Sequence, residues 1–361
     1  MTTRILTGIL SAALITGMAP VFAQDSEFPG MAATDAIEAA IADGRYGTVT
    51  SVMVLEHGEV RVEAYFNGAN ATTLHDTRSA TKTITGMVAG AAIADGHLAL
   101  DTPVADLFAD LQPFANPDPR KQAITVEDLL TMSSVMECND WNQFSRGNEE
   151  RMYLVEDWSR FFWNLPVRGF PAWQTPPEAS PHGRAFSYCT AGVQLLGEAV
   201  ERAVGQPFTA WAEARLLDPL GIDRLEWPMN GQGQAHMGGG LRLTAAGLAQ
   251  LAELQRLGGE IDGQRLLPES WTRAAISRHA VIPDSGGWEY GYLWWIRAFE
   301  VDGETYWTAA MSGNGGNRVY VLPDFGLTVV FTNTDYNTRQ MHAHADAFFE
   351  EQIVARLQGT R

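Results

Sequence analysis

The order of strand-like and helical segments along the chain limits the possible folds more than any other feature of the sequence. Segments with the alternating apolar pattern of strands lie near the two ends, whereas the apolar residues from about 98 to 285 recur at helical spacing. Strands from both ends pair most simply in one antiparallel sheet. We therefore expect an α+β fold, with an antiparallel sheet built from both chain ends, flanking helices and an inserted all-helical lobe. The main cleft should lie between the sheet and that lobe.

The expected elements divide into two lobes. The expected strands cover residues 51–56, 59–66, 290–296, 306–311, 318–322 and 327–332. The expected helices cover residues 80–95, 124–131, 149–163, 191–204, 207–217, 244–257 and 339–356. Asp35 with Glu38, and Thr125 with Asp128, have the spacing of capping boxes and predict two helix starts. We place the α/β lobe at about 30–97 and 286–361 and the helical lobe at about 98–285.

The first 23 residues have the pattern of a secretory signal peptide. Arg4 supplies a positive charge, residues 5–20 are mostly apolar, and Val21-Phe22-Ala23 fits a small-residue cleavage site. The alternative is a buried N-terminal helix. We expect residues 1–23 to be removed on export to the periplasm or the medium, leaving a single domain at 24–361. No second long apolar run follows, so we expect no membrane-spanning segment after cleavage.

Charge and cysteine content exclude several classes of function. Acidic residues outnumber basic ones by 43 to 25, and the net charge of −18 repels phosphate backbones, so nucleic-acid binding is not expected. The two cysteines, Cys138 and Cys189, are too few for a disulfide scaffold or a cysteine zinc cluster. His342 and His344 would point to different helix faces. The sequence contains no nucleotide-binding or metalloprotease motif, so we expect no metal and no cofactor.

Ser79 and Lys82 form the strongest candidate for catalysis. Three residues apart at the start of a predicted helix, they lie on one helix face. A serine hydroxyl needs a base to become a good nucleophile, and a buried lysine of lowered pKa can serve as that base. The chain has only one other lysine, Lys121, which makes a lysine in an apolar helix more informative. Alone, the spacing also occurs by chance.

Two further segments are candidates for the same site. Tyr188 precedes a predicted helix and could transfer protons if a cation such as Lys82 lies beside it; the simpler alternative is a core tyrosine. The loop 312–317 has three glycines between two expected strands, which lets the backbone approach a ligand closely; the alternative is an ordinary hairpin loop.

Together these segments resemble the serine β-lactamase and penicillin-binding superfamily, and within it the class C-like serine hydrolases. That group includes class C β-lactamases, D-alanyl-D-alanine peptidases, related esterases and 6-aminohexanoate-dimer hydrolases. Its pattern of S-x-x-K, Y-x-N and a K-T-G or H-x-G strand becomes Ser79-x-x-Lys82, Tyr188-x-Thr190 and Asn314-x-Gly316 here. Segments 95–104, 124–132 and 238–244 also look like the family, and the resemblance covers about residues 40–355.

The resemblance implies a role for each site residue. Ser79 is the acylated nucleophile, Lys82 its general base and Tyr188 a proton shuttle. The oxyanion hole would be formed by the backbone N–H groups of Ser79 and Asn317, the residue after Gly316.

Two residues differ from the family pattern. Thr190 replaces the usual asparagine, and Asn314 replaces the lysine that faces the carboxylate of a β-lactam. The sequence leaves open whether Arg318 compensates for that lysine. We therefore expect esters or neutral amides to be better substrates than penicillins or cephalosporins.

The sequence therefore predicts an exported serine hydrolase that acts on a small-molecule ester or amide through an acyl-Ser79 intermediate. The enzyme alternative is a β-lactamase or D-Ala-D-Ala peptidase. The non-enzyme alternative is a ligand-binding protein of the same fold that has lost catalysis. The resemblance places Cys138 on the rim of the cleft, and Cys189 follows Tyr188, so a Cys138–Cys189 disulfide is expected in an oxidising compartment. Two separate buried thiols are the alternative.

Overall fold

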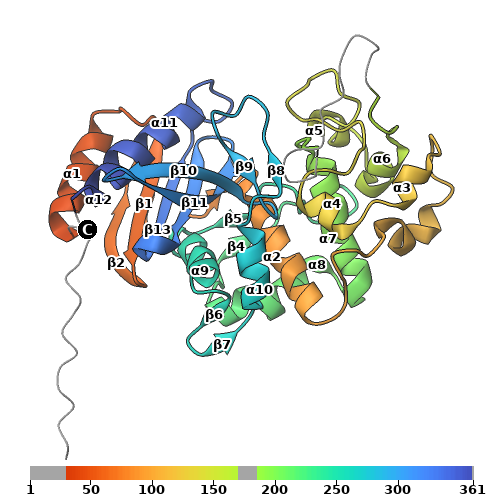
Figure 1. Ribbon diagram of the computed structural model, residues 1–361, viewed down its shortest axis with the longest axis horizontal. Coiled ribbons are helices and arrows are strands. Elements are labelled where there is room, and N and C mark those ends of the chain that lie inside the picture. Colours follow the sequence, from red (N-terminus) through yellow and green to blue (C-terminus); the bar gives the residue numbers. More distant parts are fainter. Residues whose placement is uncertain (1–29, 170–184, 360–361) are drawn as a thin grey trace, which may run out of the picture.

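The computed structural model describes residues 30–169 and 185–359. The expected signal peptide at 1–23 lies outside these residues. In Figure 1 a sheet-containing half lies beside a half made mostly of helices. The N-terminal elements α1 (Gly30–Ala42), β1 (Val49–Glu56) and β2 (Glu59–Tyr65) lie next to the C-terminal elements β13 (Leu327–Asn333), α11 (Met341–Phe348) and α12 (Ala355–Leu357). Within the described residues, no helix combines the length and the apolar character that a membrane crossing requires.

One antiparallel sheet of eight strands forms the centre of the α/β half, in the order β2-β1-β13-β12-β11-β10-β9-β8. Its strands are β1 (Val49–Glu56), β2 (Glu59–Tyr65), β8 (Ala280–Val281), β9 (Glu289–Tyr290), β10 (Trp295–Val301), β11 (Glu304–Gly313), β12 (Asn317–Leu322) and β13 (Leu327–Asn333). Val52 of β1 pairs with Phe331 of β13, so the two chain ends join in one sheet. This confirms the predicted fold class.

Helices pack on this sheet and bury its central strands along their whole length. Every residue of β1, β12 and β13 is buried. The α9 helix (Ala245–Arg256) packs against those three strands, and α2 (Ala80–Ala94) packs against β11. The π-helical turn η5 (Phe349–Val354) contacts β10. The remaining helices of this half are α1 (Gly30–Ala42), α10 (Glu269–Ala275), α11 (Met341–Phe348), α12 (Ala355–Leu357) and the 3-10 turn η4 (Pro323–Phe325).

The helical half is organised around α7 (Thr190–Val204), which contacts α2, α4 (Val126–Leu130), α6 (Trp158–Asn164), α8 (Phe208–Ala212) and η1 (Val104–Leu111). Residues 190–200 of α7 are all buried. The other elements here are η1 (Val104–Leu111), α3 (Pro119–Gln122), α4 (Val126–Leu130), α5 (Glu149–Met152), α6 (Trp158–Asn164), α8 (Phe208–Ala212), η2 (Glu213–Leu217) and η3 (Asp218–Leu220). Small sheets are formed by β3 (His75–Asp76), β4 (Leu225–Glu226) and β5 (Arg242–Leu243), and by β6 (Glu260–Ile261) and β7 (Gln264–Arg265).

Several elements differ from the expected ones. The helix expected over 149–163 is two helices, because Asp157 caps a new one by accepting a hydrogen bond from Arg160 N. The strand expected over 290–296 is divided between β9 and β10, and α1 begins before Asp35. The α9 helix lies inside the range expected for the helical lobe but packs on the sheet, since its buried leucines face β12 and β13. The capping box of Thr125 and Asp128 is present as predicted.

Candidate active site

Ser79 and Lys82 meet at the first turn of α2, as their spacing predicts. Ser79 occupies the N-cap position of the helix. Lys82 Nζ donates hydrogen bonds to Ser79 Oγ at 3.0 Å and to the Gly238 carbonyl oxygen at 2.7 Å. The Lys82 residue is 1% exposed. A buried amine in hydrogen-bond contact with a serine hydroxyl is the arrangement that nucleophile activation requires.

Tyr188 lies against the same pair from the other side of the cleft. Lys82 Nζ is 5.1 Å from the centre of the Tyr188 ring. Burial raises the pKa of the Tyr188 phenol, whereas the charge of Lys82 and a hydrogen bond with the Ser79 side chain oppose that rise. The structure therefore brings together the three residues expected to carry catalysis.

Strand β11 reaches the site at Gly313. A Cβ atom at this position would lie 2.1 Å from the Thr77 carbonyl oxygen, so only glycine fits. The next residue, Asn314, lines the cleft together with Ser79. Among the described residues, no acceptor is hydrogen-bonded to the backbone N–H of Ser79 or of Asn314. Two free N–H groups beside a serine hydroxyl form the arrangement of an oxyanion hole.

Asn317 and Gly316 lie elsewhere, contrary to the expectation for the oxyanion site. Strand β11 ends at Gly313 and the turn after it leads to β12, so Asn317 belongs to the next strand. Its Nδ2 donates to the carbonyl oxygens of Asp76 at 3.2 Å and Asn314 at 2.9 Å. Gly316 packs against the Met341 carbonyl oxygen instead. Neither residue lines the cleft, which moves the candidate donor from Asn317 to Asn314.

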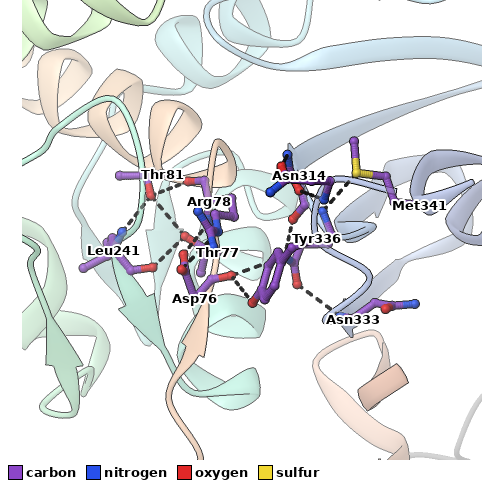
Figure 2. Close-up of polar contacts among 12 residues, drawn as sticks. Asp76, Thr77, Arg78, Thr81, Leu241, Asn314, Asn333, Tyr336 and Met341 are labelled. Atoms are coloured by element: carbon purple, nitrogen blue, oxygen red, sulfur yellow. Dashed lines mark hydrogen bonds and ion pairs between the residues drawn. The ribbon is translucent and has the colours of Figure 1, made fainter. Parts of the chain in front are cut away.

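A hydrogen-bond network fixes the segment before Ser79 to its neighbours (Figure 2). Thr77 Oγ1 donates to the Leu241 carbonyl oxygen at 2.7 Å, and Tyr336 Oη donates to the Asp76 carbonyl oxygen at 3.3 Å. Arg78 has a φ of 50°, a left-handed conformation that is strained for a residue with a side chain. The Arg78 guanidinium lies 4.4 Å from the centre of the Tyr336 ring.

The Asn314 side chain belongs to this network and does not replace the family's lysine. Its Nδ2 donates to Asn337 Oδ1 at 2.8 Å, and its Oδ1 accepts from Asn337 N at 2.9 Å. These contacts hold the turn that follows β11. The contribution of Asn314 to the cleft is therefore its backbone N–H.

Ser79 lies between two hollows of different character. The larger is a cleft of about 770 Å³ with an aromatic wall, and the smaller is a polar hollow of about 520 Å³. The aromatic wall consists of Trp141, Phe186, Tyr188, Trp288 and Trp295. Trp141 stacks on Tyr188 with ring centres 5.4 Å apart. Ser79, Glu149 and Asn314 line both hollows, so a substrate reaching Ser79 contacts an apolar surface on one side and a polar one on the other.

Arg318 supplies a cation to this cleft. It pairs with Ser312 across the β11–β12 ladder and donates from Nη1 to Ser312 Oγ at 2.5 Å. The residue is 4% exposed and lines the cleft, and its Nε has no hydrogen-bond partner in the described structure. Arg318 on β12 thus places a positive charge at the cleft.

Two acidic residues at the site were not singled out from the sequence. Thr190 donates to Asp140 Oδ2 from its backbone N at 2.7 Å and from Oγ1 at 2.8 Å. Thr190 Oγ1 is also 2.9 Å from Glu149 Oε2. Burial, with a further contribution from the charge of Glu149, raises the pKa of Asp140 to about 6, although Lys82 and Thr190 oppose the rise. No local pattern marks these acids, because segments distant in sequence bring them to Lys82.

A disulfide joins Cys138 and Cys189, whose Cα atoms are 5.4 Å apart. It links the residue after Tyr188 to the loop that carries Asp140 and Trp141. In the part of the chain that the structure describes, no group of three or more His, Cys, Asp and Glu side chains is arranged to hold a metal ion. His344 contacts Asp335 Oδ2 at 3.0 Å, whereas His342 lines the cleft.

Comparison with known proteins gives a consistent result. A family model described as Beta-lactamase matches residues 21–351. The chain is 24% identical over 311 residues to the 6-aminohexanoate-dimer hydrolase of Paenarthrobacter ureafaciens, covering 80% of this chain and 74% of that protein. It is 28% identical over 159 residues to Esterase EstB of Burkholderia gladioli, covering 42% and 37%. The crystal structure of a penicillin binding protein from Bacillus halodurans superposes with a TM-score of 0.64 at 19% identity, covering 87% and 100%.

Proposed function

Because the chain belongs to the Beta-lactamase family, we propose that it is a serine hydrolase that cleaves an ester or amide bond through an acyl-enzyme on Ser79. Two relatives by sequence are a 6-aminohexanoate-dimer hydrolase and an esterase, which supports hydrolysis of such bonds. The observation that carries the proposal is the 3.0 Å contact between Lys82 Nζ and Ser79 Oγ at the junction of two hollows.

In the acylation step each group of the site has a separate role. Lys82 Nζ takes the hydroxyl proton as Ser79 Oγ attacks the substrate carbonyl carbon. The N–H groups of Ser79 and Asn314 stabilise the oxygen that becomes negative, aided by the positive end of α2. Tyr188 delivers a proton to the leaving alcohol or amine and recovers one from the Lys82 ammonium.

Deacylation reverses these roles with water as the nucleophile. Tyr188 takes a proton from the water as it passes its own proton to Lys82, the water oxygen attacks the acyl carbon, and Ser79 Oγ leaves with the proton returned from Lys82. All of these proton transfers are assigned to side chains of this chain, so the proposed mechanism uses no cofactor. Replacing Ser79 with alanine should abolish turnover of a short-chain p-nitrophenyl ester, and an active Ser79→Ala enzyme would refute the mechanism.

The aromatic wall supports an apolar acyl or aryl group in the larger hollow, and hence a small neutral ester or amide as substrate. Arg318 supports a second candidate function. A buried guanidinium with an unpartnered Nε fits a substrate carboxylate, as in a β-lactam or a peptide ending in D-alanine. A charge-assisted contact of this kind contributes about 1.5–3 kcal/mol.

A direct comparison separates the two candidates. We expect kcat/KM for a short-chain p-nitrophenyl ester to exceed that for a chromogenic cephalosporin. Arg318→Gln should lower only the cephalosporin value. A cephalosporin value above the best ester value would make the second candidate the function. Absence of turnover for both would favour a ligand-binding protein that has lost catalysis.

We also propose that the protein is exported after removal of residues 1–23. The charged start, the apolar run and the cleavage site support this, and a disulfide fits an oxidising compartment. Cell fractionation and N-terminal sequencing test it. The mature chain should begin at Gln24 outside the cytoplasm, and an intact N-terminus in the cytoplasm would contradict export.

A further inference from the structure

The two N–H groups assigned to the oxyanion hole belong to different elements of the fold. Ser79 occupies the N-cap position of α2, whereas Asn314 follows the last residue of β11. Such a pair stabilises an oxyanion only while both donors stay about 3 Å from the position that the oxygen will occupy. Any residue that ties the two supporting segments together therefore bears on the rate of the chemical step.

Asn337 holds the Asn314 side of the hole. Asn314 Nδ2 donates to Asn337 Oδ1 at 2.8 Å, and Asn314 Oδ1 accepts from the backbone N of Asn337 at 2.9 Å. Both polar atoms of the Asn314 side chain are thus engaged, and the side chain cannot turn without breaking one of these bonds. The backbone that carries the oxyanion donor is therefore held against the segment that follows β13.

Tyr336, the preceding residue, contacts the segments on both sides of the hole. Its Oη donates to the Asp76 carbonyl oxygen at 3.3 Å, and the Arg78 guanidinium lies 4.4 Å from the centre of its ring (Figure 2). A Cβ atom at Gly315 would lie 2.6 Å from Tyr336 Cδ1, so the same ring packs closely on the turn after β11. One side chain thus connects the start of α2 with that turn.

Two buried links join the same segments and leave a separate task for Asn337. Gly313 packs on the Thr77 carbonyl oxygen, and Asn317 Nδ2 donates to the Asn314 carbonyl oxygen at 2.9 Å. These contacts fix the main chain on either side of Asn314. Asn337 holds the side chain of Asn314 itself, and because Asn337 is exposed it can be replaced without altering the buried links.

We propose that Tyr336 and Asn337 are positioning residues of the oxyanion hole, which keep the Asn314 N–H aligned with the Ser79 N–H. The inference rests on the proposed function, in which the substrate carbonyl oxygen becomes negative as Ser79 Oγ attacks. The two residues act through Asn314 and through the segment before Ser79. The oxyanion exists in the transition state and not in the bound substrate, so loosening this clamp should lower kcat and leave KM nearly unchanged.

Asn337 can be replaced without backbone strain, because glycine and aspartate both accept its φ of 60°. Asn337→Gly removes the Oδ1 acceptor. It should lower kcat for a short-chain p-nitrophenyl ester about tenfold at nearly unchanged KM, a part of the roughly 10²- to 10³-fold effect of losing an oxyanion donor outright. Asn337→Asp keeps the acceptor and should recover part of the loss.

Asn116 offers a matched control. It is exposed, has a φ of 48°, and donates from Nδ2 to the Asn164 carbonyl oxygen at 2.9 Å. It lines neither of the two hollows beside Ser79. Asn116→Gly therefore makes the same exchange and loses one side-chain hydrogen bond away from the site, and it should leave kcat and KM unchanged.

A transition-state analogue separates positioning from a loss of folded protein. An alkyl boronic acid forms a tetrahedral adduct with Ser79 Oγ that places an oxygen in the oxyanion hole. Its inhibition constant should rise in Asn337→Gly by the factor by which kcat/KM falls. Tyr336→Leu should raise it as well, and Tyr336→Phe, which keeps the ring against Gly315, should raise it less. Fluorophosphonate labelling taken to completion counts the active molecules in each variant.

An Asn337→Gly enzyme with wild-type kcat and wild-type inhibition by the boronic acid would overturn the proposal. A loss matched by Asn116→Gly, a loss confined to the labelled fraction, or an Asn337→Asp enzyme no better than Asn337→Gly would overturn it as well. Failure of the proposed function would appear separately, as a wild type that is not labelled at Ser79 or as an active Ser79→Ala enzyme. Either result would remove the oxyanion that the clamp is proposed to serve.

Discussion

The two walls of the cleft are held in place by different means. We call residues 75–82 and 311–314 the sheet wall, and residues 138–149 with 186–190 the loop wall. The sheet wall rests on a strand paired on both sides and on the close fit of Gly313 against Thr77. The loop wall has little regular structure and depends on a disulfide and on buried hydrogen bonds to Asp140. Paired strands thus hold Ser79 in place, whereas the disulfide and the hydrogen bonds to Asp140 hold Tyr188 and Thr190.

The largest effect should come from removing Lys82, which belongs to the sheet wall and also lies against Tyr188 of the loop wall. Lys82→Ala should lower kcat/KM by about 10²- to 10⁴-fold, the usual contribution of a general base. The loss should appear with esters and amides alike, because the step concerned is the activation of Ser79. Steady-state kinetics on both substrate types measure it. Lys121→Ala, which removes the chain's other lysine, is the control for charge, and equal losses in both variants would contradict the assignment.

Loss of the disulfide should affect the loop wall selectively. The two cysteines are 51 residues apart, and the chain-entropy model gives about 4 kcal/mol of stability for a loop of that length. Urea unfolding of the Cys138→Ser/Cys189→Ser variant should show a decrease of up to this size. Turnover should fall because Tyr188 loses its fixed position, while Ser79 should still react with a fluorophosphonate. Equal loss of labelling and turnover would show that the two walls are not independent.

The pH dependence of stability should have opposite signs in the two walls. Burial lowers the pKa of His75 in the sheet wall to about 4. The unfolded chain therefore binds a proton below pH 6.5 that the folded chain does not bind until about pH 4. The free energy of unfolding should fall by up to about 3 kcal/mol as pH falls through that window.

Asp140 in the loop wall acts in the other direction. Its pKa is raised from 3.8 to about 6, so between these values the folded chain binds a proton that the unfolded chain does not. That contribution to the free energy of unfolding rises as pH falls. Urea unfolding across the window should show a weaker pH dependence for His75→Gln than for the wild type and a steeper fall for Asp140→Asn. If the free energy of unfolding depended on pH equally in all three proteins, the predicted opposite contributions of His75 and Asp140 would be refuted.

The smallest expected effect is a test of close packing in the sheet wall. Gly313→Ala introduces a methyl group 2.1 Å from the Thr77 carbonyl oxygen, so β11 or α2 must move. Overpacking of this kind costs about 1–3 kcal/mol, and displacement of the Asn314 N–H should also lower turnover. Gly231→Ala is the matched control, since nothing lies within 4 Å of its added methyl group. A Gly313→Ala enzyme with wild-type stability and activity would refute the close packing of Gly313 against Thr77.

What the sequence predicts well is local. Ser79 and Lys82 are one helical turn apart, so helix geometry alone determines their contact. The same holds for the capping box of Thr125 and Asp128. The fold class follows from the positions of the strand-like segments, because strands from the two ends have few other partners.

The remaining features depend on packing between distant segments. The family pattern was matched to Asn314-x-Gly316, whereas the contact of Gly313 with Thr77 places Asn314, and not Asn317, at the cleft. Asp140 and Glu149 lie in a loop with no distinctive pattern, and the position of α7 brings them to Thr190. The break between α5 and α6 was missed because the apolar spacing continues through Asp157.

The identity of the nucleophile is tested most directly by covalent labelling. The protein would be treated with a fluorophosphonate probe and digested, and the modified peptide would be identified by mass spectrometry. The account predicts a single modified residue, Ser79, with labelling abolished in Ser79→Ala and strongly slowed in Lys82→Ala. Modification of any other serine, or unchanged labelling of the Ser79→Ala protein, would contradict the central claim.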